Sequence, residues 1–152
     1  MSAESKDSGA SPSAPPAKAD VRPASDAVKG ADDSPIVQYL VIRKDLVEVE
    51  KWPLGALLAQ ASHAAVAAVW LNREDPATIE YCSGTNLDNM HKVVLELKNE
   101  VQLRNFSEKL EAKGVKHKLW MEQPENIPTC LATKPYKKSD IADEFIKCKL
   151  CR

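Results

Sequence analysis

The first 34 residues of this chain contain no aromatic residue, no leucine and no isoleucine. Alanine, serine and proline dominate the stretch, which carries six acidic and four basic side chains. Such a segment cannot bury enough apolar surface to offset the entropy lost on ordering. We therefore predict a disordered tail at residues 1–34 and a folded domain at 35–152. The tail lacks the apolar core of a secretory signal, and its acidic residues are unlike a transit peptide, so we expect a cytoplasmic protein.

The chain also has few cysteines, a net charge close to zero and no long apolar run. Of the four cysteines, Cys148 and Cys151 form a C-x-x-C pair, but no second pair and no matching histidines are spaced to complete a zinc site. We predict no metal and no organic cofactor. The formal net charge is −1, which gives no electrostatic argument of its own for nucleic acid. No run approaches ~18 apolar residues free of polar side chains, so we expect no membrane span.

The rest of the chain alternates between strand and helix patterns. Short β-branched runs predict strands, and apolar residues at helical spacing, with Asn99 as a cap and Gly114 as a stop, predict helices. The expected strands are 36–43, 91–97, 115–121 and 129–133, and the expected helices are 53–72, 99–114 and 139–147, with a short helix near 78–82. The order β-α-β-α-β-β-α predicts an α/β three-layer sandwich with a mixed sheet of about four strands.

The most informative segment is the helix LGALLAQASHAAVAAV at residues 54–69. A helix this apolar on every side is expected to be buried. Gln60 and His63 lie three residues apart and therefore share one face. Either both are satisfied inside the core, with His63 bonded to the backbone, or they line a cleft. We predict that Gln60 faces a cleft and that His63 is partly buried one turn behind it.

Two polar clusters lie at loop positions, where α/β domains commonly place ligand sites. One is Arg43-Lys44-Asp45, at the end of the first strand, and the other is Glu122 to Asn126, between the last two strands. Taken singly, Asp45 also fits a turn cap and Glu122 a solvated loop acid. We expect both clusters to meet Gln60 at one cleft.

The segments RKDL at residues 43–46 and LAQASHAA at 58–65 resemble the signature of the type II peptidyl-tRNA hydrolases of archaea and eukaryotes. The resemblance extends over residues 36–147 and includes the HKVVLEL strand and the helix after it. Two segments are more particularly similar to those of a divergent subgroup called peptidyl-tRNA hydrolase domain-containing proteins. They are WPLGALLAQASHA and LWMEQPENI. The resemblance implies hydrolysis of the ester that joins a peptide to the 3′ ribose of tRNA.

Ester hydrolysis needs an activated water and donors for the developing oxyanion. The family carries two lysines just before the helix, and here Leu54 and Ala56 occupy those positions. The family's aspartate in the loop before the last strand has Glu122 as its nearest counterpart. We predict catalytic roles for Gln60, His63, Glu122 and Asp45, and substrate-binding roles for Arg43, Lys44, Asn126 and Thr129.

Because both lysines are replaced, two other functions stay open beside the hydrolase. The chain could keep the fold and bind tRNA or another RNA without catalysis. It could also be a protein-interaction module that uses the tail or the face of the sheet. Binding to RNA predicts an affinity that falls steeply with salt, because phosphate contacts release counterions, whereas a protein adaptor does not.

Overall fold

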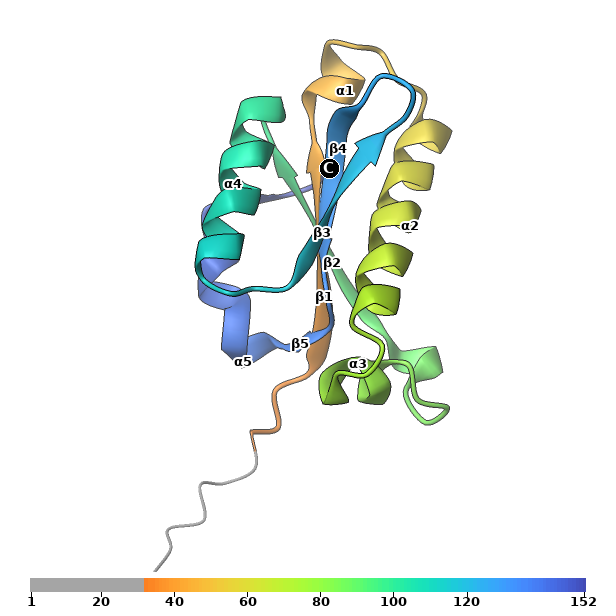
Figure 1. Ribbon diagram of the computed structural model, residues 1–152, viewed down its shortest axis with the longest axis vertical. Helices are drawn as coiled ribbons and strands as arrows, with labels where there is room; N and C mark the ends of the chain where they lie inside the picture. The colour runs from red at the N-terminus through yellow and green to blue at the C-terminus, as the bar shows by residue number, and fades with distance from the viewer. Residues whose placement is uncertain (1–31) are drawn as a thin grey trace, which may run out of the picture. The chain divides into compact units, whose positions relative to one another are not determined.

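The computed structural model describes residues 32–152, so residues 1–31 of the predicted tail lie outside the described part of the chain. One strand begins the fold, a group of helical elements follows it, and the later strands are joined by helix α4 and by short connections (Figure 1). In chain order the elements are β1 (Ile36–Arg43), α1 (Asp45–Glu48), α2 (Leu54–Leu71), α3 (Pro76–Tyr81), η1 (Leu87–Asn89), β2 (His91–Leu97), α4 (Glu100–Ala112), β3 (His117–Glu122), β4 (Ile127–Thr133), β5 (Tyr136–Lys137), α5 (Lys138–Ile141), η2 (Ala142–Phe145) and β6 (Lys149–Leu150).

The strands form one mixed sheet in the order β3-β4-β1-β2-β6, with β5 paired to β1. Strand β1 runs parallel to β2 and antiparallel to β4, so it forms the centre of the sheet. The predicted α/β class with a mixed sheet is confirmed. The expected count of about four strands is wrong, because the sheet in the described residues has six. The two additional strands, β5 and β6, are two residues long, too short for an alternating pattern to reveal them.

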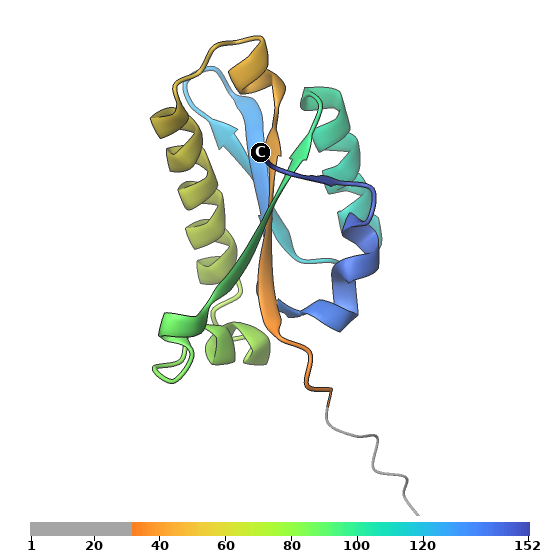
Figure 2. The ribbon, with the colours of Figure 1, turned by 180° about the vertical axis from the view of Figure 1, so that it is seen from behind.

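Alternate side chains of β1 enter two hydrophobic clusters on opposite faces of the sheet. Val37, Tyr39 and Val41 pack with residues of α4 and η2, while Leu40 and Ile42 pack against α2. Figures 1 and 2 show α2 and α3 on one side of the sheet and α4 and α5 on the other. A strand with helices on both sides is mainly apolar, which accounts for the sequence IVQYLVIR. The side-chain nitrogen of its buried Gln38 donates to the Ala65 and Thr133 carbonyls.

Helix α2 packs one face on the sheet and leaves the other exposed. Its buried residues are small or polar, chiefly Gln60, Ala64, Ala65 and Ala68, whereas Trp70 is 67% exposed. The expectation that this helix is buried on all sides is therefore wrong, because none of the described elements covers its outer face. In the described part of the chain, only α2 has the length and mean hydropathy of a membrane span. A helix that packs on a sheet through alanines shares that composition.

The boundaries of the later elements agree with the sequence except near the C-terminus. The Asn99 side chain caps α4 by accepting a hydrogen bond from the Gln102 N–H at 3.1 Å, and Gly114 follows that helix with φ +71°. The helix predicted at 139–147 is wrong as one element. It consists of α5 and the tighter η2, which brings the Phe145 ring to 4.1 Å from that of Tyr39.

We expect the small residues of α2 to set its distance from the sheet. Ala68→Leu adds three carbons at a position with no exposed surface and is expected to lower the free energy of unfolding by about 1–3 kcal/mol. Ala59→Leu makes the same change on the exposed face of the same helix and should alter it by less than about 0.5 kcal/mol. Urea unfolding of both variants measures the difference, and equal effects would contradict this packing.

Candidate active site

The predicted site residues lie at one end of the sheet, where β1 ends, β4 begins and α2 starts (Figure 1). They form two groups on opposite faces. Arg43 contacts the start of α4 and holds Asp45, whereas Gln60, His63 and Glu122 lie with α2 and the β3–β4 hairpin. The prediction that both clusters meet Gln60 at one cleft is therefore wrong for Arg43 and Asp45, which the central strands separate from Gln60.

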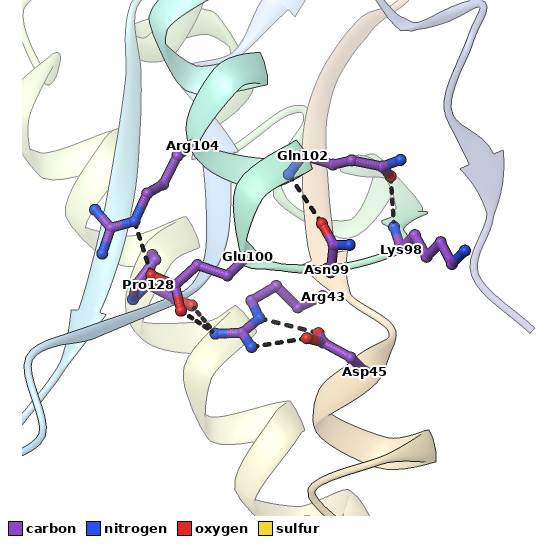
Figure 3. Close-up of polar contacts among 8 residues, drawn as sticks. All are labelled: Arg43, Asp45, Lys98, Asn99, Glu100, Gln102, Arg104 and Pro128. Carbon is purple, nitrogen blue, oxygen red and sulfur yellow. Dashed lines mark hydrogen bonds and ion pairs between the residues drawn. The ribbon is translucent and has the colours of Figure 1, made fainter.

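Arg43 is the centre of a polar network (Figure 3). Its Nε and Nη2 donate to the two carboxylate oxygens of Asp45 at 3.0 and 2.8 Å. Its Nη1 donates to Glu100 at 3.2 Å and to the Pro128 carbonyl at 3.0 Å. The hydrogen bond to Asp45 raises the pKa of the guanidinium. Only 6% of Arg43 is exposed, so its donors join β1, α1, α4 and β4 rather than face solvent.

The start of α4 completes this network (Figure 3). Arg104 Nε donates to the other oxygen of Glu100 at 2.8 Å. The Gln102 side chain reaches back to accept from the Lys98 N–H at 2.9 Å, while Asn99 caps the first turn. Glu100 also lies in the first helical turn, where a carboxylate interacts favourably with the helix dipole. The end of β1 is therefore held by charge and capping contacts together.

Lys44 follows β1 and lies beside Glu48 of α1 and Glu96 of β2. Its Nζ forms ion pairs with Glu48 at 3.0 Å and Glu96 at 3.4 Å, and these hydrogen bonds raise the pKa of the ammonium group. A pocket of about 280 Å³ lies beside it. The pocket is lined partly by Ile42, Val47, Leu54 and Leu57. It is mainly apolar, with the charges of Lys44 and its partners at the rim.

Gln60 is fixed by two successive residues of β4. Thr129 Oγ1 donates to Gln60 Oε1 at 2.9 Å, and Cys130 Sγ donates to the Gln60 carbonyl at 3.2 Å. Both side chains reach α2 because the β3–β4 register shifts here, with Met121 opposite Pro128 and Trp120 opposite Cys130. Thr129 is the extra residue of this β-bulge, which turns its side chain towards the helix.

The nitrogen of the Gln60 side-chain amide can donate hydrogen bonds to a ligand. Among the described residues, none accepts a hydrogen bond from Gln60 Nε2. The residue is 4% exposed, and Nε2 is not one of the fully enclosed polar atoms that lack a partner. Because Thr129 holds the oxygen, the two N–H donors of Nε2 point away from β4. The arrangement leaves an oriented donor, only slightly exposed, beside α2.

His63 stacks on Trp120, with ring centroids 4.8 Å apart and planes 19° from parallel. Trp120 Nε1 donates to Glu122 Oε2 at 3.4 Å. The prediction that His63 is partly buried is wrong: the residue is exposed. It projects from α2 over the hairpin, where the indole ring supports it. The structure thereby connects His63 and Glu122 through a tryptophan.

Asn126 lies in the turn between β3 and β4. It has φ +56°, a left-handed conformation that asparagine tolerates better than most residues. Its side-chain oxygen accepts from Gln123 Nε2 at 3.2 Å in an exposed position. In this arrangement Asn126 shapes the turn of the hairpin. Glu122, at the end of β3, is the residue bonded to Trp120.

Sequence reasoning missed Trp120 and Cys130 as members of the site. Trp120 and Glu122 are two residues apart on a strand and therefore share a side, a signal that was present in LWME. Cys130 gave no such signal, because its contact with Gln60 depends on the bulge. In the folded protein, burial raises the pKa of its thiol to about 12. Across the described residues, no cluster of three potential metal ligands occurs.

Residues 36–151 match the family model described as peptidyl-tRNA hydrolase PTH2. The chain belongs to the PTH2 family. It is 46% identical over 136 residues to the mouse protein named "Putative peptidyl-tRNA hydrolase PTRHD1", covering 86% of this chain and 96% of that protein. The human protein of the same name is also 46% identical, over 125 residues that cover 82% of this chain and 88% of that protein. The resemblance to a divergent PTH2-domain subgroup is thereby confirmed.

In this PTH2 domain, the Arg43 network predicts a clear difference between two arginine substitutions. Arg43→Met leaves Asp45, Glu100 and the Pro128 carbonyl without their buried donor, and should lower the free energy of unfolding by about 2–4 kcal/mol. Arg104→Met removes a partly exposed i,i+4 partner of Glu100 and should cost less than about 0.5 kcal/mol. Denaturant unfolding compares the two. Similar losses for both would show that Arg43 is not the central contact.

Proposed function

We propose that this chain hydrolyses the ester of peptidyl-tRNA and that Gln60 stabilises the negative charge that develops on the carbonyl oxygen. The observation that carries the proposal is the Gln60 amide, whose oxygen is bonded to Thr129 and whose nitrogen has no protein acceptor in the described residues. Membership of the PTH2 family supports peptidyl-tRNA as the substrate.

A preorganised donor is effective because it need not reorient as charge develops. Gln60 meets this condition through its side-chain bond to Thr129 and its backbone bond to Cys130. The oxygen of an ester carbonyl placed about 3 Å from Nε2 would accept a hydrogen bond from it in the ground state. That hydrogen bond would be stronger in the transition state, when the oxygen carries negative charge. The bulge at Thr129 is what supplies this orientation.

The proposal assigns activation of water to Glu122 rather than to Asp45 or His63. Both oxygens of Asp45 accept hydrogen bonds from Arg43 on the far face of the sheet. The His63 ring is stacked on Trp120, whereas Glu122 has one oxygen directed by Trp120 and the other available to accept a proton from water. A carboxylate in this role is a general base.

The two lysine positions differ in where they lie relative to Gln60. Ala56 precedes Gln60 by four residues, so both share a face of α2. Leu54 is the first residue of α2, is 68% exposed and lines the apolar pocket beside Lys44. Without a cation at either position, the helix provides no side-chain charge near the ester. We therefore propose a hydrolase that is slower than relatives carrying a lysine there, by at least ~10²-fold.

The first test compares Gln60→Ala with Ser62→Ala in the purified full chain, with an N-blocked aminoacyl-tRNA as substrate. Gln60→Ala should lower kcat/KM by ~10²–10³-fold, the effect of removing one oxyanion donor. Ser62 lies on the same helix but is exposed, and its hydroxyl donates only to the Leu58 carbonyl, so Ser62→Ala should leave the rate within about twofold. Equal rates for wild type and Gln60→Ala would overturn the role of Gln60.

The second test restores a cation. Ala56→Lys should raise the rate by at least ~10-fold, because the added charge lies one turn from Gln60 and on its face. Leu54→Lys should raise it less, since that position lies towards the apolar pocket. Rates are measured beside a lysine-containing PTH2 enzyme. A wild-type rate equal to that enzyme would mean that another group, such as Lys51, already supplies the charge.

The same assays separate the alternatives. No turnover for wild type, Ala56→Lys and Leu54→Lys, with tRNA binding that weakens as salt rises, would favour an RNA-binding relative. Loss of tRNA binding as well would favour a protein-interaction module. For that case the exposed part of the sheet, among the described residues, includes Lys92 and Val94 of β2.

A further inference from the structure

We infer that His63 and Trp120 form a platform on which the 3′-terminal base of the RNA stacks. This surface, which we call the aromatic platform, consists of the His63 ring from α2 and the Trp120 ring from β3. The inference rests on the proposed function for the identity of the ligand, an RNA end whose terminal ribose carries the ester. It adds a binding role to residues beside the reacting group.

The first argument is the geometry of the two rings. They are nearly parallel and 4.8 Å apart, so they already have the offset-stacked arrangement that aromatic pairs prefer. His63 is exposed, so the stack reaches the surface instead of ending inside the core. Single-stranded RNA is recognised mainly by stacking its bases on such side chains.

The second argument is that the platform is held in place. Trp120 Nε1 is bonded to Glu122, and the indole packs against the hydrophobic cluster under α2. Trp120 pairs in the sheet with Cys130, the residue bonded to the Gln60 carbonyl. A base that stacks here would therefore not have to order the rings first, which reduces the entropic cost of binding.

The third argument is position. His63 follows Gln60 by three residues on α2, a rise of ~4.5 Å along the helix. In a nucleotide whose ribose oxygen carries the ester, the base lies one sugar ring away from that ester. The platform therefore lies about one helical turn along α2 from the position proposed for the carbonyl. Helix α2 carries no acidic side chain from Leu54 to Leu71, so the helix side of the platform presents no negative charge to RNA phosphates, and the Glu122 carboxylate lies on the strand side.

The experiment uses the full chain and the RNA trinucleotide 5′-CCA-3′, with the same RNA lacking its 3′ base as the matched probe. In a chain with Trp52→Phe and Trp70→Phe, Trp120 is the remaining tryptophan of three, so its fluorescence reports the platform alone. We expect quenching by CCA and at least fivefold weaker binding of the abasic RNA. Equal binding of the two RNAs would overturn the inference.

Substitutions in the otherwise wild-type chain, measured by calorimetry, test the same point. His63→Ala should weaken CCA binding about 5- to 150-fold, the range for loss of one stacked aromatic. Trp120→Phe keeps a ring and should weaken it less. Trp70→Ala removes an exposed aromatic elsewhere on α2 and should change it by less than about twofold. Because His63 is exposed, His63→Ala should melt within a few degrees of wild type, and unchanged binding by this variant would refute the platform.

The two proposals fail separately. If the chain hydrolyses N-blocked aminoacyl-tRNA, His63→Ala should raise KM and leave kcat within about threefold, as expected for a binding contact. An unchanged KM would remove the platform and leave the hydrolase. If there is no turnover but CCA binding follows the pattern above, the platform stands and the catalytic proposal falls.

Discussion

The candidate site depends on one local constraint, the extra residue that β4 carries at Thr129. In a regular strand successive side chains point to opposite faces, and only one of Thr129 and Cys130 would reach α2. The bulge directs both to the helix, where they bind the side chain and the backbone of Gln60. It therefore orients the Gln60 amide and adds polar contacts to the alanine packing that sets the distance of α2 from the sheet.

The Arg43 network performs the complementary task on the other face. Arg43 joins four elements through buried and partly buried hydrogen bonds, so the end of β1 and the start of β4 are held before any ligand arrives. A fixed end of the sheet on one face and a held amide on the other suit the proposed function, in which the site orients an ester. The RKDL motif, which a sequence reader takes for ligand-binding residues, thus includes an arginine and an aspartate whose contacts are internal to the protein.

The sequence predicted the α/β class, the β2 boundaries and the Asn99 cap, because each rests on local patterning or capping. It did not predict the exposed outer face of α2, since composition reports how apolar a helix is but not how many neighbours it has. Nor did it predict that Thr129 and Cys130 share a side, because a bulge breaks the two-residue period on which strand arguments depend. Gln60 was found because a lone amide in an alanine-rich helix demands a partner, and Trp120 was missed because it fits a core strand equally well.

The central place of β1 has a consequence for biosynthesis. This strand is complete at Arg43, yet its antiparallel neighbour β4 ends at Thr133, about 90 residues later. At the ~5–20 residues per second of ribosomal synthesis, roughly 5–18 s pass during which one hydrogen-bonding edge of an apolar strand has no native partner. The nascent chain therefore passes through a period of aggregation risk that is set by its topology.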